Sequence, residues 1–381
     1  MNAAADGAAE AGMRTALVAH ERYFWHDTSG SIGNSTAGAY AQPVRHYEHP
    51  DTKRRLLGLL EVSGLLDQLL RVAPREASFD ELRRFHTKRY IRHVSVLSAG
   101  AGGEAGEAAP VGHGSFEIAQ LAVGGCLAAG DAVMSGRARN AYALVRPPGH
   151  HAEADRGRGY CLFNNAVLLV RHLQQVHGLG RIAVVDWDVH HGNGTESAFI
   201  EDPSVLTISV HQDRNYPIDS GTLEVIGRGA AAGTNLNIPL PAGSGHGAYL
   251  ASFERVVVPA LQRFCPEFLV IASGLDASIM DPLGRMMCTS ETFRELTRLL
   301  MSAADGLCGG RIVATHEGGY SNEYVPFCGL AVLEELSGVR TAAADPYLKE
   351  FERAAGRELL PHQDAAVSAA AQLLARVPGR G

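Results

Sequence analysis

Short apolar runs alternate with stretches of helical periodicity along most of the chain. The runs are rich in β-branched residues and are bounded by turn residues, whereas the intervening stretches repeat apolar residues three and four positions apart. The runs lie at 15–20, 141–145, 182–186, 204–211, 235–240, 268–273 and 311–316, and the helical stretches at 54–70, 79–98, 115–134, 246–262, a segment through Leu300 and the C-terminal remainder. This alternation predicts an α/β fold with a mainly parallel central sheet.

Segments rich in glycine, proline and small residues interrupt the pattern at three places. Residues 1–12 are alanine-rich and acidic, and we expect them to be disordered. Residues 23–50 and 100–114 are typical of long surface loops, which often carry function. No repeat or linker divides the rest, so we expect one domain over residues 13–381.

Four of the predicted strands end in polar motifs. These are RPPGHH, DWDVHHGNG, GLDA and EGGY, and the carboxyl ends of parallel strands lie along one edge of an open sheet. A closed barrel would gather them too, but the long first loop and the uneven strand spacing favour the open sheet. The side chains expected to meet at this edge are those of His150, His151, Asp186, Asp188, His190, Asp276 and Tyr320.

The stretch 182–194 carries the densest chemistry. Side chains alternate between faces in an extended segment, so Asp186, Asp188 and His190 are expected to project from one side of the strand's end. Carboxylates this close raise each other's pKa unless a cation lies between them, which indicates a metal. The alternative is a solvated acidic loop beside a core histidine, although strand ends are the usual place for sites in α/β folds.

Composition narrows the function classes. The chain has 381 residues, 46% of them hydrophobic, and its net charge of −7 argues against a nucleic-acid partner. The opening segment lacks the apolar core of a signal peptide and no apolar run reaches spanning length, so we expect a cytoplasmic protein outside the membrane. Six cysteines without a C-x-x-C pattern indicate no disulfide framework or thiolate zinc cluster, whereas 17 histidines favour a metal site.

Jointly and in this order, the four motifs resemble those of the histone deacetylase family, specifically its class II branch and the bacterial deacetylase-like amidohydrolases. The resemblance covers roughly residues 15–340. It implies an arginase-like α/β fold with about eight parallel strands, and hydrolysis of acetyl-lysine or a similar acylated amine. It also implies a zinc ion held by Asp188, His190 and Asp276, three ligands that leave a position open for water and the substrate carbonyl.

The resemblance further implies catalytic roles. His150 and His151 match the tandem histidines that orient water and protonate the leaving amine, and Asp186 matches the carboxylate that supports His150. Asn193 stands where class I members have an aspartate, so His151 is expected to be less basic. Tyr320 matches the tyrosine that polarises the acetyl carbonyl; without the other motifs it would be interpreted as a packing residue after a Gly-Gly turn.

Structural potassium and self-association are further expectations. A homodimer or a homotetramer is expected, and the sequence does not fix the number of subunits. By the resemblance, one potassium site involves Asp186, Asp188, His190, Ser209 and Val210, and a second involves Phe199, Asp202 and Val205.

The walls of the expected substrate tunnel depart from the family pattern. Two phenylalanines are usual there, whereas this chain has Tyr160, after Gly159, and Tyr216. An inward hydroxyl facing methylene groups would lack a partner, so both hydroxyls are expected to point outward to the rim. Leu283 stands where polyamine-selective relatives have a glutamate, which favours an acyl-lysine or a neutral amide over an acetylpolyamine.

Two other functions fit parts of this pattern. An arginase-like ureohydrolase shares the fold but binds two manganese ions through a D-x-H-x-D pattern, and this chain has D-x-D-x-H-H without spare ligands. A catalytically silent acyl-lysine binder would have lost a zinc ligand or Tyr320, and all are present. The sequence therefore favours a zinc-dependent deacetylase, with an acetylpolyamine deacetylase as the alternative.

Overall fold

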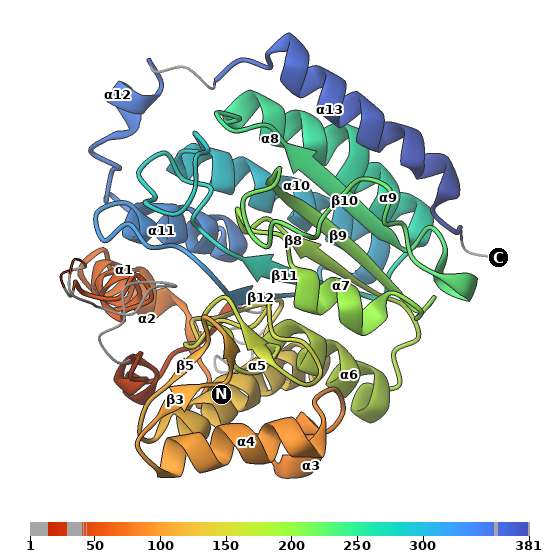
Figure 1. Ribbon diagram of the computed structural model, residues 1–381. Helices are drawn as coiled ribbons and strands as arrows, with labels where there is room; N and C mark the ends of the chain where they lie inside the picture. Colours follow the sequence, from red (N-terminus) through yellow and green to blue (C-terminus); the bar gives the residue numbers. More distant parts are fainter. Residues whose placement is uncertain (1–13, 29–39, 41, 43, 354–356, 380–381) are drawn as a thin grey trace, which may run out of the picture.

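Eight parallel strands form the central sheet of the computed structural model, which describes residues 14–28, 40, 42, 44–353 and 357–379 (Figure 1). Their order is β10-β9-β8-β11-β12-β6-β1-β2, and each neighbouring pair is parallel. The bounds are β1 Ala16–Val18, β2 Leu70–Arg71, β6 Ala141–Ala143, β8 Ile182–Asp186, β9 Val205–Gln212, β10 Asn235–Leu240, β11 Phe268–Ser273 and β12 Ile312–His316. The predicted α/β fold with about eight parallel strands is confirmed; β2 is the strand that the apolar pattern did not predict.

Helices cover both faces of this sheet (Figure 1). One face carries α1 Asp51–Val62, α2 Leu65–Gln68, α8 His246–Ser252, α9 Val258–Phe264, α10 Ser290–Cys308, α11 Val325–Ser337 and α13 Pro361–Ala371. The other carries α3 Phe79–Leu82, α4 Lys88–Ala99, α5 Ser115–Met134 and α6 Asn165–His177, while α7 Asn193–Phe199 begins just beyond β8 and α12 Leu348–Phe351 lies at the periphery.

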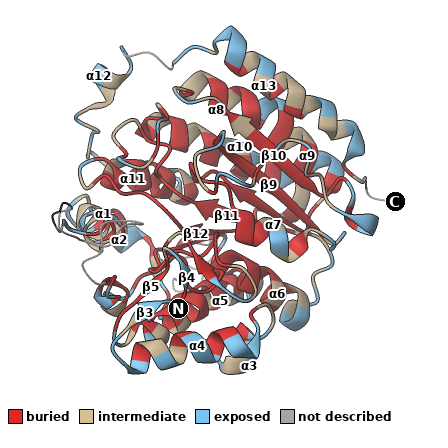
Figure 2. Cartoon of the chain, in the orientation of Figure 1, coloured by how far each residue is buried: buried red, intermediate tan, exposed pale blue. Residues whose placement is uncertain are grey.

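The central strands are buried on both faces. In β8, Ala183 and Val185 belong to the apolar cluster under α8 to α11, whereas Ile182 and Val184 belong to the cluster under α4 to α6. Figure 2 shows the sheet as almost continuously buried between the two helical layers. A strand with two buried faces needs apolar residues at every position, which explains the unbroken apolar runs in the sequence.

Two predicted helices are interrupted. The helix predicted over 54–70 divides into α1 and α2 at Gly64, whose φ of 78° is readily adopted only by glycine, and its last residue belongs to β2. The helix predicted over 79–98 divides into α3 and α4, because Thr87 caps α4 by accepting a hydrogen bond from the N–H of Tyr90. Apolar spacing continues across both breaks, so periodicity could not locate them.

The helix predicted over 246–262 contains a change of helical type. Between α8 and α9 lies a π-helical turn, Phe253–Val257. Pro259 lies two residues after this turn and has no N–H to donate to it, which favours such a local widening.

The predicted loops are only partly irregular. Residues 1–12, expected to be disordered, lie outside the described residues, as does much of the loop 23–50. The described part of that loop begins in a 3-10 turn, Glu21–Trp25, that buries Tyr23. Within the loop 100–114, β3 Gly103–Glu104 pairs with β5 Pro110–Val111, and β4 Gly106–Glu107 pairs with β7 Gly157–Arg158.

Helix α5 is a core helix of the second layer. It is long and apolar enough to cross a membrane by length and composition alone, which corrects the expectation that no apolar segment reaches that length. Its apolar window is, however, 72% buried inside the fold, against α6, β1 and β6. Burial of this kind is what a helix without a polar face requires in a globular protein.

The strands that carry the four motifs are neighbours in the sheet. β8, β11, β12 and β6 lie side by side, and each motif follows the carboxyl end of its strand. β9 and β10 extend the sheet on one side of β8, and the chain then crosses to β11 on the other side. A reversal of this kind opens a crevice at the carboxyl ends of the strands, which is where sites form in such sheets.

A buried ion cluster fixes the end of the first loop to the segment after β6. Glu48 is fully buried, and its Oε1 accepts hydrogen bonds from Lys53 Nζ (3.2 Å) and Arg146 Nε (2.9 Å). Arg146 also donates to the backbone carbonyls of Tyr23 and His26. Burial raises the pKa of Glu48, but Arg146 and Lys53 outweigh that effect and hold the pKa well below its ordinary value. The cluster therefore anchors the RPPGHH motif from behind.

Replacing Glu48 by glutamine should destabilise the protein strongly. The substitution leaves two buried cations without their counter-ion, and breaking a buried ion pair costs about 3–5 kcal/mol. Urea denaturation followed by circular dichroism should show this loss. The control Glu76→Gln breaks the ion pair between Glu76 and Arg22, whose two side chains are 49% and 38% exposed, respectively. It should change the free energy of unfolding by less than about 1 kcal/mol. Equal midpoints for both variants would contradict the anchoring role.

Candidate active site

Asp188, His190 and Asp276 bring three ligand atoms together at the ends of β8 and β11. His190 Nδ1 lies 3.0 Å from Asp188 Oδ1 and 3.2 Å from Asp276 Oδ2, and all three residues are buried. One ligand atom from each lies within 4.8 Å of the others. The structure thus gathers the three residues that the sequence led us to expect around a metal.

The chain reaches this arrangement by turns rather than by an extended segment. β8 ends at Asp186, whose Oδ1 accepts a hydrogen bond from the N–H of Asp188 (3.0 Å). Asp188 Oδ1 in turn accepts one from the N–H of His190 (2.9 Å). Aspartates that bond the backbone two residues ahead curl the chain. Asp186 and Asp188 nevertheless both lie beside His150, while Val185, Trp187 and Val189 pack together in the opposite apolar cluster, so the three polar side chains share one side as expected even though the chain bends.

The donor set fits a divalent metal ion. Asp276 Oδ2 is buried, and apart from the ion-pair contact with His190 Nδ1 it has no hydrogen-bond partner among the described residues. Burial, assisted by the charge of Asp188, raises the pKa of Asp276 to about 6, and a cation would remove this repulsion. A Cβ at Gly318 would lie 2.1 Å from Asp276 Oδ2 and 2.7 Å from Asp188 Oδ2, so only glycine leaves room beside the two carboxylates. One imidazole and two carboxylates are ligand types that zinc takes.

His150 lies beside the ligand cluster and is oriented by Asp186. Its Nδ1 is 2.9 Å from Asp186 Oδ2, and its Nε2 is 3.7 Å from Asp188 Oδ2. Burial lowers the pKa of His150, but the charges of Asp188 and Asp186 outweigh that effect and raise it to about 10. A divalent cation held by Asp188 would oppose this rise, because it takes up the same negative charge.

His151 has a different environment, built on an amide. Its Nδ1 is 2.8 Å from Asn193 Oδ1, while Asn193 Nδ2 donates to Glu153 Oε1 (2.9 Å) and to the carbonyl of His151 (3.3 Å). These contacts fix the amide with its oxygen toward the ring, so His151 carries its proton on Nδ1 and leaves Nε2 basic. Burial, followed by the charges of His150 and His190, lowers the pKa of His151 well below its ordinary value. The ring is therefore neutral.

A cavity of about 220 Å³ opens onto His151 and His190. His151 and His190 line it together with the expected tunnel residues Gly159, Tyr160, Tyr216 and Leu283, and with Tyr320. At Gly159, where φ is 51°, a Cβ would lie 2.4 Å from the His151 ring and 2.8 Å from the Tyr216 ring. Only glycine therefore keeps the cavity open at this point.

The cavity walls carry the aromatic rings of Tyr160, Tyr216 and Tyr320, and the hydroxyl of Tyr216 lies at the rim. The Tyr216 hydroxyl donates to Glu107 Oε1 (3.2 Å), an exposed contact, so this hydroxyl points outward as expected. The Tyr160 ring stands edge-on to Tyr320, with centroids 5.8 Å apart. The carbonyl of Leu283 accepts a hydrogen bond from Asn215 (3.1 Å).

Tyr320 is held in the wall by a carboxylate that the sequence did not single out. Its N–H donates to Asp281 Oδ2 (2.7 Å), and the N–H of Leu283 donates to Asp281 Oδ1 (2.9 Å). Burial, followed by the charges of Asp276 and Asp188, raises the pKa of Tyr320 well above its ordinary value. The hydroxyl therefore stays protonated and is a hydrogen-bond donor at neutral pH.

Two further carboxylates were missed by sequence reasoning. Glu317 Oε2 accepts hydrogen bonds from the N–H groups of Gly149 (2.6 Å) and His150 (3.0 Å), and so fixes the loop of the tandem histidines. Burial raises the pKa of Glu317 to about 7. Glu153 fixes Asn193 in the same way. Both lie in or beside a motif, but their partners are distant in sequence, so no local pattern identifies them.

The residues of the two expected potassium sites lie close together in each case. Asp186 in β8 stands opposite Ser209 in β9. Phe199, Asp202 and Val205 share one turn, in which the N–H of Asp202 donates to the carbonyl of Phe199 (2.9 Å) and the N–H of Val205 to that of Asp202 (3.3 Å). Both potassium sites stay predictions.

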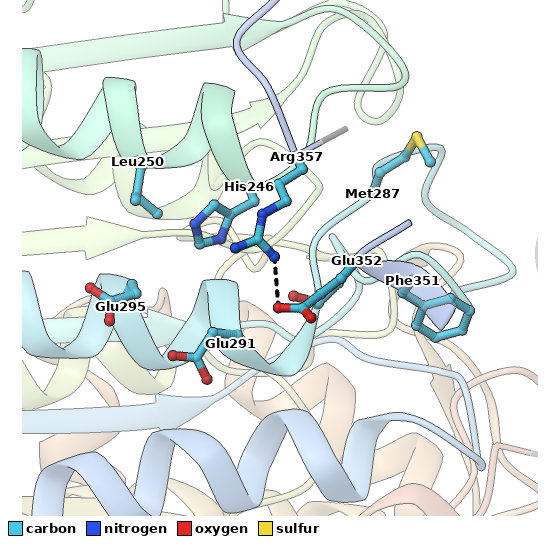
Figure 3. A pocket seen from close by; sticks show the side chains of 9 residues that line it. His246, Leu250, Met287, Glu291, Glu295, Phe351, Glu352 and Arg357 are labelled. Carbon is cyan, nitrogen blue, oxygen red and sulfur yellow. Dashed lines mark hydrogen bonds and ion pairs between the residues drawn. The ribbon is translucent and has the colours of Figure 1, made fainter. Parts of the chain in front are cut away.

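A second cavity, also of about 220 Å³, lies between α8, α10 and the segment after α12 (Figure 3). Its three acidic residues are already paired: Glu291 with Arg294 (3.1 Å), Glu295 with Arg298 (2.6 Å) and Glu352 with Arg357 (2.6 Å). None of the groups of three metal ligands found among the described residues lies in it. It matches the first cavity in volume but lacks the reactive groups.

Comparison with known proteins identifies the family to which the chain belongs. The histone deacetylase domain matches residues 46–336. The chain is 48% identical to the histone deacetylase-like amidohydrolase of Pseudomonas aeruginosa over 89% of this chain and 90% of that protein. It is 38% identical to the human polyamine deacetylase HDAC10 over 82% of this chain and 46% of that protein.

A solved structure extends the comparison to the fold. The HDA15 HD domain has a TM-score of 0.79 and 31% sequence identity, over 96% of this chain and 99% of that domain. A domain match over most of the chain, close sequence similarity and the shared sheet thus coincide with the four motifs at one sheet edge. The chain belongs to the histone deacetylase family.

Proposed function

We propose that this protein is a zinc-dependent deacetylase that hydrolyses the amide of acetyl-lysine, or of a similar small acylated amine, and releases acetate. Membership of a family of deacetylases and amidohydrolases supports a hydrolase. The observation that carries the finer proposal is the convergence of Asp188, His190 and Asp276 beside two differently tuned histidines. Of these groups, His151 and His190 line the cavity that Tyr160 and Tyr216 frame.

Zinc held by Asp188, His190 and Asp276 would polarise the substrate carbonyl and lower the pKa of a water molecule. The protein's own side chains carry the proton transfers. His150, fixed through Nδ1 by Asp186, orients the water. His151 is neutral with a basic Nε2, so it takes up the proton there and passes it to the leaving amine, which departs poorly unless protonated.

Tyr320 completes the site as a hydrogen-bond donor. Its hydroxyl stays protonated, and it donates to the carbonyl oxygen as negative charge develops there. Asp281 holds the backbone of Tyr320 and of Leu283 and so keeps the donor in the cavity wall.

The cavity favours a slim aliphatic substrate stem. Its volume of about 220 Å³ is below the usual range of drug-sized pockets, and Leu283 offers only apolar contact. The second candidate is an acetylpolyamine, whose distal ammonium would meet Glu107 and Asp219; these are 48% and 68% exposed and share a single cation, Arg158. A relative named as a polyamine deacetylase supports that candidate too.

We include three further expectations in this proposal: the two potassium sites, a homodimer or homotetramer, and a cytoplasmic location.

A substrate screen tests the proposed function. Zinc-loaded protein should be assayed for acetate release from acetyl-lysine peptides, trifluoroacetyl-lysine and acetylpolyamines, with Asp276→Asn as the inactive control. Hydrolysis of at least one class, abolished in the control, is expected. Urea release from guanidino substrates instead would support the arginase-like function.

Three tyrosine variants separate chemistry from binding. Tyr320→Phe removes the donor to the developing negative charge and should lower kcat by roughly a hundredfold or more. Tyr216→Phe and Tyr160→Phe should leave kcat nearly unchanged and alter KM by a few-fold, the ~1 kcal/mol of a hydrogen bond. The three variants should be compared on one acetyl-lysine peptide. A large kcat loss in either tunnel variant would show that the wrong tyrosine has been assigned to the chemistry.

Substrate choice should respond to Leu283. A glutamate there would attract the distal ammonium of an acetylpolyamine, so Leu283→Glu should raise its kcat/KM relative to acetyl-lysine by about tenfold. The control Leu283→Gln has the shape of the glutamate side chain without its charge, and it should not shift the ratio of kcat/KM between the two substrates. An equal shift in Leu283→Gln would contradict a role for charge at this position. A strong preference of the unaltered protein for acetylpolyamines would contradict acetyl-lysine as the substrate class.

The pH profile should respond to Asn193, in a way that Glu153 modifies. An aspartate at 193 would raise the pKa of His151, and because His151 acts neutral, the acidic limb of kcat/KM should move to higher pH. Glu153 lies 2.9 Å from the amide and would repel that carboxylate, so the shift should be clearest in Asn193→Asp combined with Glu153→Gln. Glu153→Gln alone is the control. An unchanged limb in the double variant would mean that His151 is not the titrating group.

A further inference from the structure

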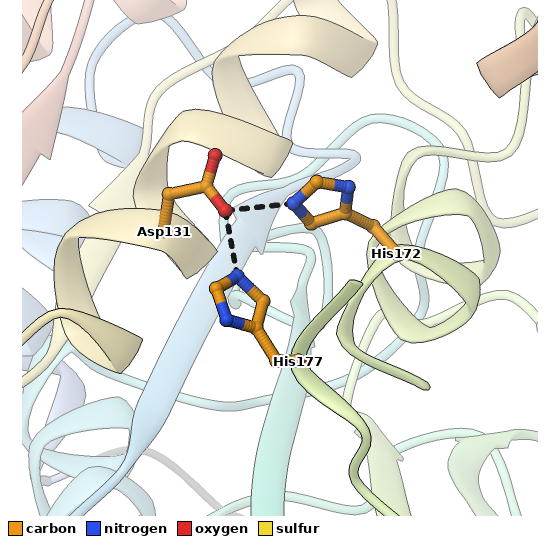
Figure 4. A group of neighbouring side chains, drawn as sticks. All are labelled: Asp131, His172 and His177. Atoms are coloured by element: carbon orange, nitrogen blue, oxygen red, sulfur yellow. Dashed lines mark hydrogen bonds and ion pairs between the residues drawn. The ribbon is translucent and has the colours of Figure 1, made fainter. Parts of the chain in front are cut away.

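We propose that Asp131, His172 and His177 form a second metal site, the α5–α6 site, for a divalent transition-metal ion such as Zn²⁺. Asp131 lies near the end of α5, and the two histidines lie in the last turns of α6 (Figure 4). Asp131 Oδ1 is 2.7 Å from His172 Nε2 and 2.8 Å from His177 Nε2. The two imidazoles therefore converge on one carboxylate oxygen from two separate turns.

The ligand types and their exposure suit a bound ion. One ligand atom from each residue lies within 4.8 Å of the others, and two imidazoles with one carboxylate are a set that zinc takes. The His172 side chain is 4% exposed and is held in place, whereas His177 and Asp131 are 23% and 43% exposed. Water can therefore supply the remaining ligand.

The α5–α6 site is separate from the candidate active site. Its ligands come from two helices that pack on one face of the sheet, not from the ends of strands, and none of them lines the active-site cavity. A metal ion there would crosslink α5 and α6 and would stabilise the folded chain without taking part in the chemistry.

Arg84 competes with a metal ion for His172. Arg84 Nη1 lies 3.0 Å from His172 Nδ1, and a guanidinium can only donate. His172 must therefore accept at Nδ1, carry its proton on Nε2 and donate that proton to Asp131. A metal ion on Nε2 would move the proton to Nδ1, where it would face the donor of Arg84. Binding consequently requires Arg84 to turn away, which weakens the affinity.

This competition gives a test with opposite signs. Zinc-loaded, buffer-exchanged protein should be titrated with Zn²⁺ by calorimetry, with unfolding temperature and deacetylase activity measured alongside. The unaltered protein should bind one ion more per chain than His177→Ala, which should lose that ion or bind it at least tenfold more weakly. Arg84→Ala should bind it roughly fivefold more tightly, the equivalent of one hydrogen bond. The matched controls are His93→Ala and Arg83→Ala, two exposed residues that are not part of the site, and both should behave as the unaltered protein.

The outcomes separate this site from the proposed function. Because the comparison is a difference between variants, it holds whatever ion occupies the active site, and each variant should retain its activity and fold. Equal stoichiometry in His177→Ala and the unaltered protein would overturn the α5–α6 site. Unchanged or weaker binding in Arg84→Ala would overturn His172 Nε2 as a ligand.

Discussion

Asp188 and Asp276 face each other in the interior of the protein, and the repulsion between these two carboxylates is the constraint on which the site depends. Neither is exposed to solvent. Buried charges persist only where donors or opposite charges compensate them. The N–H groups of Gly318 and Val189 and the ring of His190 supply part of that compensation. A divalent cation would complete it, so the same arrangement that destabilises an empty site would favour a filled one.

The order and register of the strands bring Asp188 and Asp276 together. β8 and β11 are neighbours in the sheet although 81 residues of the chain lie between Asp186 at the end of β8 and Phe268 at the start of β11. Their register places Ala272 beside Asp186. The reversal of strand order beside β8 leaves the crevice open, and the flanking strands β12 and β6 bring Tyr320 and the tandem histidines to its edge. Behind these groups, Glu153, Asp281 and Glu317 fix the backbone and amide positions on which the proposed proton transfers depend.

Sequence reasoning reached the fold class and the convergence of the motifs, because both follow from local patterns. Apolar runs identified the strands with two buried faces, and polar residues at their ends identified the site edge. Sequence reasoning did not predict the helix breaks at Gly64 and Thr87, because the apolar periodicity continues through both. The curl at Asp186 and Asp188 was missed because side-chain to backbone hydrogen bonds replaced the extended conformation. The supporting carboxylates were missed because their partners come from distant segments.

Zinc X-ray absorption on the His177→Ala variant tests the central claim most directly, since that variant lacks the α5–α6 site. The account predicts about one zinc per chain with only nitrogen and oxygen neighbours at about 2.0–2.2 Å, and loss of that zinc when Asp276→Asn is added while circular dichroism stays unchanged. A sulfur neighbour near 2.3 Å, or two tightly bound manganese ions per chain, would contradict a zinc site formed by Asp188, His190 and Asp276.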